Sequence, residues 1–174
     1  MPTLLLMAGL PGAGKSTLAL ALGRALSWPV LDKDLVEGAL RAATPPVVAP
    51  TALAYDATFT LLADLLGPQG QSVILDSPAT NPAQVARAER IADACGARVR
   101  AVLCVADRGT RNARMVREVP PTDRAWRHPA RRVPSTVAGD GRDQFNHLPL
   151  DATLIVETTR SQEAIVAEVV AWLN

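Results

Sequence analysis

Gly9-Leu10-Pro11-Gly12-Ala13-Gly14-Lys15-Ser16-Thr17 is the stretch of sequence that decides the fold of this chain. It matches G-x-x-x-x-G-K-[ST], the pattern of a phosphate-binding loop. Residues 3–8, just before it, are short and apolar, as in a buried parallel strand. Residues 18–26, just after it, are rich in good helix formers. Strand, glycine loop and helix therefore follow one another as the motif requires, which disfavours a glycine-rich turn that fits by chance.

The residue types of this loop indicate how it would bind a nucleotide. Glycines let the chain wrap closely, so that successive backbone N–H groups point at phosphate oxygens, and the helix N-terminus adds a partial positive charge. Lys15 would reach the β- and γ-phosphates, and the Ser16 hydroxyl would ligate Mg²⁺. We therefore expect residues 9–17 to bind ATP, with Mg²⁺ as the second cofactor.

Length and composition are those of one globular domain. The chain has 174 residues, of which 48% are hydrophobic and 20% charged. A net charge of +1 does not by itself imply a nucleic-acid or membrane partner. Cys95 and Cys104 lie far apart in apolar surroundings and are interpreted as buried thiols of an intracellular protein. With no basic region before the first apolar run and no stretch long enough to span a membrane, we expect a cytoplasmic protein.

Strands and helices are predicted to alternate along the chain. The pattern predicts further strands at 28–31, 72–76, 98–105 and 152–157, and further helices at 35–41, 51–66, 82–95 and 161–173. Asn81 and Ser161 suit helix starts, and residues 135–143 are predicted to be flexible. Five side chains of the 51–66 helix are expected in the core: Leu53, Phe59, Leu62, Leu65 and Leu66. The predicted class is α/β, a parallel sheet with helices on both faces that binds ligands beyond the carboxyl ends of its strands.

Three aspartates follow predicted strands at that edge. Asp32 and Asp34 come after the second strand, and Asp76 ends the third. Phosphoryl transfer needs one carboxylate to orient or deprotonate the acceptor hydroxyl and another to hold Mg²⁺, so we assign Asp34 as the base and Asp76, with Ser16, to the metal. The alternatives are a helix N-cap for Asp34 and a strand-ending turn residue for Asp76. For Asp32, a role in phosphoryl transfer and a structural role as a cap or turn residue are equally favoured.

Arginines recur at helical spacing after the fourth strand, at positions 108, 111, 114 and 117. Such a stripe is either solvated helix surface or part of a lid, around residues 108–132, whose guanidinium groups clamp phosphate and exclude water. We prefer Arg114 and Arg117 as catalytic residues, with Arg111 next. His128 and His147 have no triad partner or metal-ligand spacing and are assigned no role.

Taken together, these residues resemble a family of small P-loop kinases. The resemblance rests on the loop, on Leu31-Asp32-Lys33-Asp34, on Val73-Ile74-Leu75-Asp76 and on His128-Pro129-Ala130. The family includes polynucleotide 5′-hydroxyl kinase, gluconate kinase, chloramphenicol phosphotransferase and the zeta-toxin kinases, and many members are described only as AAA-type predicted kinases. The resemblance implies an adenylate-kinase-like core with sheet order 2-3-1-4-5 and transfer of the ATP γ-phosphate to a hydroxyl. It also implies a general-base role for Asp34.

Two departures from the family bear on the acceptor. Polynucleotide kinases place an arginine shortly after the catalytic aspartate, near the substrate phosphate, where this chain has Glu37 and Gly38 and its first arginine is Arg41. The family's Asp-Thr-Asn after the third strand is replaced by residues 77–80, Ser-Pro-Ala-Thr. We therefore favour a kinase for a small-molecule hydroxyl. A polynucleotide 5′-kinase, disfavoured by the few aromatics available for base stacking, and a nucleotide-binding regulatory ATPase remain the alternatives.

Overall fold

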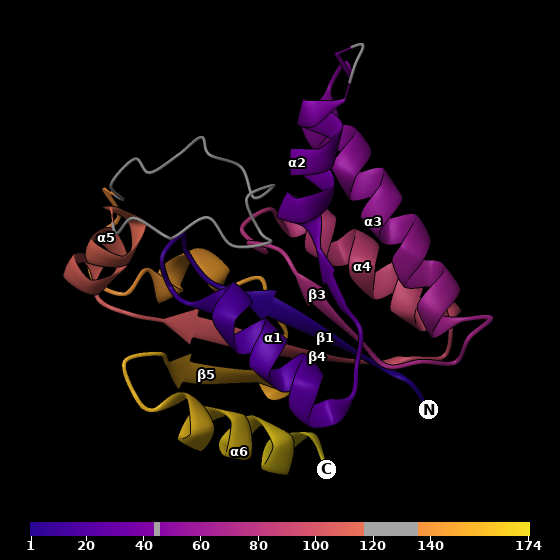
Figure 1. The fold of residues 1–174 in the computed structure, drawn as a ribbon. Coiled ribbons are helices and arrows are strands. Elements are labelled where there is room, and N and C mark those ends of the chain that lie inside the picture. Colours follow the sequence, from indigo (N-terminus) through magenta and orange to yellow (C-terminus); the bar gives the residue numbers. More distant parts are fainter. Residues whose placement is uncertain (44–45, 117–135) are drawn as a thin grey trace.

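Five parallel strands form one sheet in the order β2-β3-β1-β4-β5, as predicted from the resemblance. The computed structural model describes residues 1–43, 46–116 and 136–174 (Figure 1). The strands are β1 (Thr3–Ala8), β2 (Val30–Asp32), β3 (Val73–Asp76), β4 (Arg98–Val105) and β5 (Thr153–Glu157). The helices are α1 (Lys15–Leu26), α2 (Lys33–Ala42), α3 (Pro50–Leu66), α4 (Pro82–Ala94), α5 (Arg108–Val116) and α6 (Gln162–Leu173), with two 3-10 turns, η1 (Arg142–Phe145) and η2 (Leu150–Ala152).

Side chains of β1 alternate between two cores, one on each face of the sheet. Leu4 and Leu6 pack in a cluster with side chains of α3, α4 and β3, whereas Leu5 and Met7 pack with α1, α6 and β5. Figure 1 shows α1 and α6 together on one side of the sheet, with α4 behind it and α3 beside α2. The buried apolar run of β1 therefore carries the phosphate loop out of the middle of a three-layer structure.

Helix starts follow their predicted capping residues. The Asn81 side chain accepts the backbone N–H of Ala83 at 3.0 Å, and the Ser161 hydroxyl accepts that of Ala164 at 3.3 Å. The α2 helix begins two residues earlier than its apolar pattern indicates, because Asp32 caps it. These contacts satisfy first-turn N–H groups that have no acceptor within a helix.

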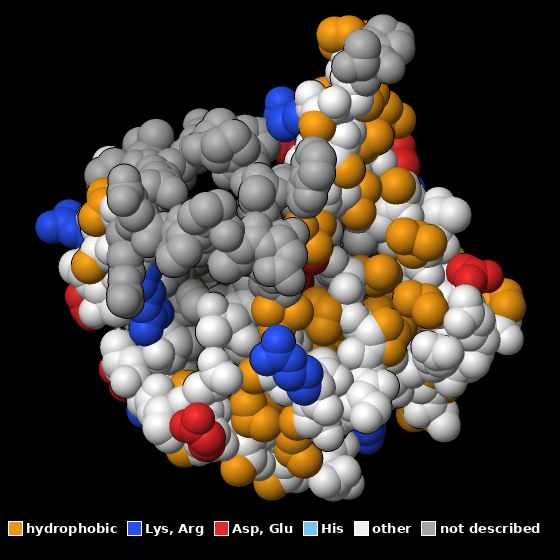
Figure 2. All heavy atoms as spheres, in the orientation of Figure 1, with side chains coloured by type: hydrophobic (Ala, Val, Ile, Leu, Met, Phe, Trp, Pro, Cys, Tyr) orange, Lys and Arg blue, Asp and Glu red, His pale blue; other side chains and the backbone are white. Residues whose placement is uncertain are grey.

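One expectation about packing is wrong. Leu53 is 43% exposed instead of buried, because the first turns of α3 extend beyond the sheet with α2 (Figure 1); Phe59, Leu62 and Leu66 are buried, and Leu65 is half-buried. Hydrophobic side chains reach the surface over this hairpin (Figure 2). In the described part of the tract predicted to be flexible, residues 136–143, the carbonyls of Val137 and Gly139 each accept a hydrogen bond at 2.9 Å from Arg111.

Candidate functional site

Glycines of the phosphate loop sit where no other residue fits. Gly9 has φ of 138°, and a Cβ there would lie 2.4 Å from the carbonyl oxygen of Cys104. Gly12 has φ of 79°, and its Cβ would lie 2.4 Å from the carbonyl oxygen of Arg111. Both conformations are those that glycine adopts without steric cost. The loop therefore holds its shape by packing its backbone directly on the backbone of β4 at Cys104 and of α5 at Arg111.

The loop leads into the first turn of α1. The N-cap is Gly14, which has no side chain to accept the first N–H groups, and Leu18 N–H donates to its carbonyl at 3.1 Å. First-turn N–H groups and the helix dipole together make such a helix start an anion site. The Lys15 ammonium donates to the Leu10 carbonyl at 3.1 Å, so this lysine lies over the loop that it is expected to serve.

Two aspartates meet at the carboxyl edge of the sheet beside this loop. Asp76 pairs in register with Met7 on one side and with Asp32 on the other, and both aspartates are buried. Asp32 is the N-cap of α2, because its Oδ1 accepts the backbone N–H groups of Asp34 at 3.0 Å and Leu35 at 3.3 Å. The capping alternative considered for Asp34 thus applies to Asp32. Asp34 instead presents a carboxylate that is 53% exposed.

A charge cluster surrounds Asp34 at the start of α2. Lys33 Nζ lies 2.5 Å from Asp34 Oδ1 and 2.7 Å from Glu37 Oε2. The other Glu37 oxygen accepts from Arg41 Nη2 at 2.5 Å and from the Thr51 hydroxyl of α3 at 2.8 Å. Both Lys33 and Glu37 are buried. The spacing of Lys33, Glu37 and Arg41 along one helix face was visible in the sequence, but the burial of Lys33 and Glu37 was not.

Burial and pairing act against each other on the pKa values of this cluster. Burial alone would lower the pKa of Lys33, but the hydrogen bonds and charges of Asp34 and Glu37 raise it above its usual value. Burial alone would raise the pKa of Glu37, but hydrogen bonds from Lys33, Thr51 and Arg41 lower it to about 2. Both groups are therefore charged near neutral pH.

Ser16 and Asp76 are chemically suited to Mg²⁺. The metal prefers oxygen ligands and usually keeps waters and substrate phosphates in its shell, with only one or two carboxylates from the protein. A serine in the first turn of α1 and a buried carboxylate at the end of the adjacent β3 match that requirement. Among residues 1–43, 46–116 and 136–174 there is no group of three or more His, Cys, Asp or Glu side chains able to form a complete metal cage.

Arg114 reaches the phosphate loop. Its Nη1 donates to the Thr158 hydroxyl at 2.9 Å and to the Gly12 carbonyl at 3.3 Å, and its Nη2 donates to the Thr158 carbonyl at 2.8 Å. The Thr158 hydroxyl in turn donates to the Ala13 carbonyl at 2.8 Å. Thr158 follows β5, and no local pattern in the sequence singles it out. Arg117, the other preferred arginine, lies outside the described residues.

Arg111 does not belong to a solvated stripe. It is 0% exposed, and its guanidinium donates to the carbonyls of Ala106, Gly139 and Val137. Helical spacing placed it correctly on α5, but the covering segment, residues 136–141, comes from later in the chain. Arg111 thus ties α5 to that segment.

Cys104 and His147, which were assigned no role, take part in packing and hydrogen bonding, and Cys95, expected to be buried, is half-buried. Burial raises the pKa of the Cys104 thiol to about 12, so it is a core thiol and not a nucleophile. The His147 Nε2 lies 2.9 Å from the Ala79 carbonyl, next to the Pro78 carbonyl that accepts the Gly9 N–H at 3.3 Å. His128 lies outside the described residues. Through these contacts the segment after Asp76 is attached to the phosphate loop.

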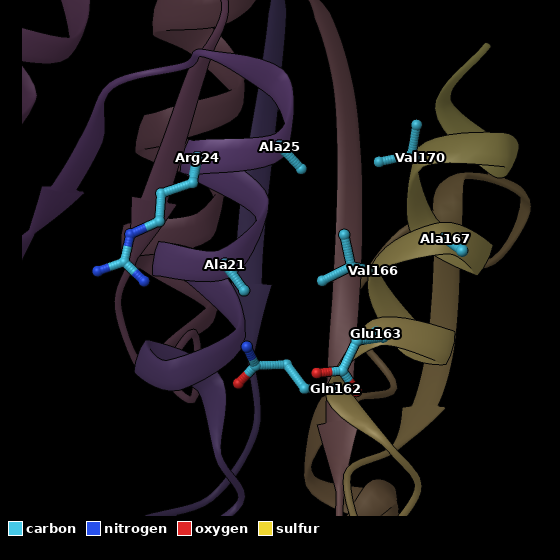
Figure 3. A pocket seen from close by; sticks show the side chains of 8 residues that line it. All are labelled: Ala21, Arg24, Ala25, Gln162, Glu163, Val166, Ala167 and Val170. Carbon is cyan, nitrogen blue, oxygen red and sulfur yellow. The ribbon is translucent and has the colours of Figure 1, made fainter.

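An open surface groove lies between α1 and α6, away from this site. Figure 3 shows apolar side chains of Ala21, Ala25, Val166 and Val170 facing it. No residue of the phosphate loop and neither Asp34 nor Asp76 lines it. In the part of the chain that the structure describes, no helix is long and apolar enough to cross a membrane.

Comparisons with known proteins agree with this architecture. A family model described as an AAA domain matches residues 4–145. No curated protein matches the sequence significantly. A candidate kinase from Chloroflexus aurantiacus is 24% identical, with a TM-score of 0.73 over 97% of this chain and 96% of its own.

Two further solved structures are more distant in sequence. The Mycobacterium tuberculosis APS kinase, solved with AMPPNP and APS, is 20% identical, with a TM-score of 0.66 over 99% of this chain and 97% of its own. A gluconokinase from Sinorhizobium meliloti is 16% identical, with a TM-score of 0.61 over 98% and 90%. At these identities the likeness concerns the fold.

Proposed function

The chain belongs to the AAA domain family whose model covers residues 4–145, and from this premise we propose that it is an ATP- and Mg²⁺-dependent kinase. Its acceptor is a hydroxyl group of a small molecule. The family and the kinase folds around it support a P-loop phosphotransferase. The neighbour solved with AMPPNP supports an adenine nucleotide as phosphoryl donor.

One observation carries the choice of a kinase. The exposed carboxylate of Asp34 stands just beyond β2, and its own helix start is capped by Asp32, so Asp34 is not needed for capping. Asp76 and the phosphate loop lie on neighbouring strands at the same edge. A site for hydrolysis alone needs only a positioned water, whereas an exposed carboxylate beside a phosphate loop suits an acceptor that must lose a proton.

The residues would divide the reaction as follows. Loop N–H groups and Lys15 bind the phosphates, and Ser16 and Asp76 hold Mg²⁺, which neutralises charge on the phosphate oxygens. Asp34 takes the proton of the acceptor hydroxyl. At the same time the hydroxyl oxygen bonds to the γ-phosphorus, and the bond between that phosphorus and the oxygen bridging to the β-phosphate breaks. Arg114 and Arg117, within a lid around residues 108–132, stabilise the transferred group. The contacts of Arg114 to Gly12 and Thr158 put it at the loop already.

The surroundings of Asp34 favour a small molecule over a polynucleotide. Arg41 is the first arginine after Asp34, and its guanidinium is paired with the buried Glu37. An arginine committed in this way is a poor partner for the phosphate of an oligonucleotide. Binding through scattered backbone contacts would in any case weaken steeply with added salt.

A transfer screen tests this function. The protein is incubated with labelled ATP and Mg²⁺ against metabolite polyols and sugars, aminoglycoside-type antibiotics, nucleosides and 5′-hydroxyl oligonucleotides. We expect a phosphorylated small molecule, and the Asp34→Asn variant should lose about 10²–10⁴-fold in kcat while still binding ATP. Lys15→Ala should lose about 10²-fold or more.

The other outcomes of the screen are equally informative. Transfer only to oligonucleotides would replace the small-molecule acceptor by the polynucleotide alternative. ATP hydrolysis that no acceptor changes would indicate a regulatory ATPase. A Lys15→Ala variant as active as the wild type on an identified acceptor would overturn the mechanism.

A further inference from the structure

We propose that Lys33 is a positioning residue for Asp34: its buried ammonium, anchored by Glu37, holds one oxygen of the Asp34 carboxylate and leaves the other for the acceptor hydroxyl. This inference rests on the proposed function. It adds a role for Lys33 and Glu37 to the residues that the kinase motifs assign.

The contacts of Lys33 are unusual for a lysine. Its side chain is 8% exposed, and its Nζ lies 2.5 Å from Asp34 Oδ1, 2.7 Å from Glu37 Oε2 and 5.4 Å from the centre of the Tyr55 ring. An ammonium has three N–H groups, and these three partners lie on three different residues. Lysine is seldom buried without such pairing. The geometry therefore fixes the ammonium, whereas Asp34 remains half in solvent.

Glu37 is the anchor of this arrangement. Its second oxygen is held by Arg41 from the same helix and by Thr51 from α3, so the carboxylate cannot follow Lys33 if the lysine moves. Arg41 lies on the far side of Glu37 from Lys33 in this chain of contacts and makes no described contact with Asp34. The two cations can thus be separated by mutation: only Lys33 touches the proposed base.

A held carboxylate matters for two physical reasons. A short aspartate side chain in the first turn of a helix would otherwise sample several rotamers, and misplacing a catalytic group by about 1 Å can reduce the rate about 10²-fold. Asp34 must also approach a triphosphate that carries the same sign of charge. An ammonium at 2.5 Å offsets part of that repulsion.

The sequence makes this contact directly observable. Lys15 and Lys33 are the only lysines of the chain, so a protein labelled with ¹⁵N-lysine gives side-chain ammonium signals from these two residues alone. A Lys15→Ala variant assigns them. We expect a slowly exchanging Lys33 signal that shifts in Asp34→Asn and stays in place in the control Asp64→Asn, whose carboxylate pairs with Gln69 on the surface. A Lys33 signal that is indifferent to Asp34→Asn would overturn the proposal, whatever the enzyme does.

Steady-state kinetics with the acceptor found in the screen test whether the Lys33–Asp34 contact contributes to catalysis. Lys33→Met keeps the stem and leaves Glu37 paired with Arg41 and Thr51, so the variant should fold. We expect kcat to fall roughly tenfold to a hundredfold, with KM for ATP changed less than about threefold. The control Arg41→Met removes the other cation of Glu37, but Thr51 and Lys33 still hold this carboxylate, so kcat should change less than about twofold.

The double variant Lys33→Met/Asp34→Asn distinguishes a positioning role of Lys33 from a role in stability alone. If Lys33 acts through Asp34, Lys33→Met should cost less than about twofold in an Asp34→Asn background. Equal losses in both backgrounds, or an Arg41→Met defect as large as that of Lys33→Met, would refute the positioning role while the kinase itself stands. Full transfer activity in Asp34→Asn would instead refute the base role of Asp34, and ATP hydrolysis that no acceptor changes would refute the proposed function. Should Lys33→Met fail to fold, the ammonium spectra of the wild type and Asp34→Asn still decide.

Discussion

Replacing Arg111 by methionine should destabilise the protein without disabling its chemistry. Arg111 donates from Nη1 to the Ala106 carbonyl at 2.5 Å and to the Gly139 carbonyl at 2.9 Å, and from Nη2 to the Val137 carbonyl at 2.9 Å. Methionine keeps most of the buried stem but none of the donors. Three carbonyls lose a charged partner at once.

The size of the stability loss in Arg111→Met depends on which of these carbonyls water can reach. Gly139 is exposed and Val137 half-buried, so solvent can partly replace the guanidinium there, whereas Ala106 is 2% exposed. A hydrogen bond to a charged group contributes about 1.5–3 kcal/mol, and removing a buried charge returns part of its desolvation cost. We expect a loss of about 2–4 kcal/mol, which for a chain of this length corresponds to roughly 5–10 °C in Tm.

Calorimetric unfolding of Arg111→Met, with the exposed Arg108→Met on the same helix as control, measures this loss. The free energy of unfolding of the Arg108→Met control should stay within about 0.5 kcal/mol of the wild-type value. At a temperature where both variants are folded, kcat of Arg111→Met should remain within about threefold of the wild type. A variant as stable as the control but catalytically dead would show that Arg111 belongs to the transfer machinery after all.

Two other predictions concern the loop and the charge cluster. Gly12→Ala should weaken ATP binding about tenfold or more in a titration, since its Cβ meets the Arg111 carbonyl at 2.4 Å; unchanged affinity would mean that the loop adopts another shape in solution. Glu37 has its folded-state pKa lowered from 4.5 to about 2, so its stabilisation is complete above about pH 4.5 and disappears as the pH falls toward 2. In urea melts between about pH 4.5 and pH 2, the free energy of unfolding of the Glu37→Gln variant should therefore fall less than that of the wild type. Parallel pH profiles of the two proteins would contradict the lowered pKa of Glu37.

Features of the fold and site that depend on neighbouring residues could be predicted from the sequence. The strand, loop and helix around Gly9–Thr17 are contiguous, so their fold could be inferred from a few neighbouring residues, and parallel strands then bring Asp32 and Asp76 to the same edge. The choice between Asp32 and Asp34 as helix cap was open, because both are favoured capping residues and only the backbone geometry separates them.

Other features depend on contacts between distant segments. Helical spacing identified Arg111 but could not show that residues 136–141 cover it, and Leu53 fits the apolar period of a helix that extends past the sheet. Lys33 and Glu37 lie one turn apart, yet their burial requires α3. The roles of Arg117, of a lid around residues 108–132 and of Asp34 as base stay predictions.

The shape of the phosphate loop has a consequence for how the protein is made. The loop is synthesised before the segments that shape it, because its backbone rests on Cys104 and Arg111 and is bonded to Thr158. On the ribosome the nascent chain therefore carries the complete motif while the surfaces that shape the loop are still being made. Nucleotide affinity should arise only when the segment that follows β5 has emerged.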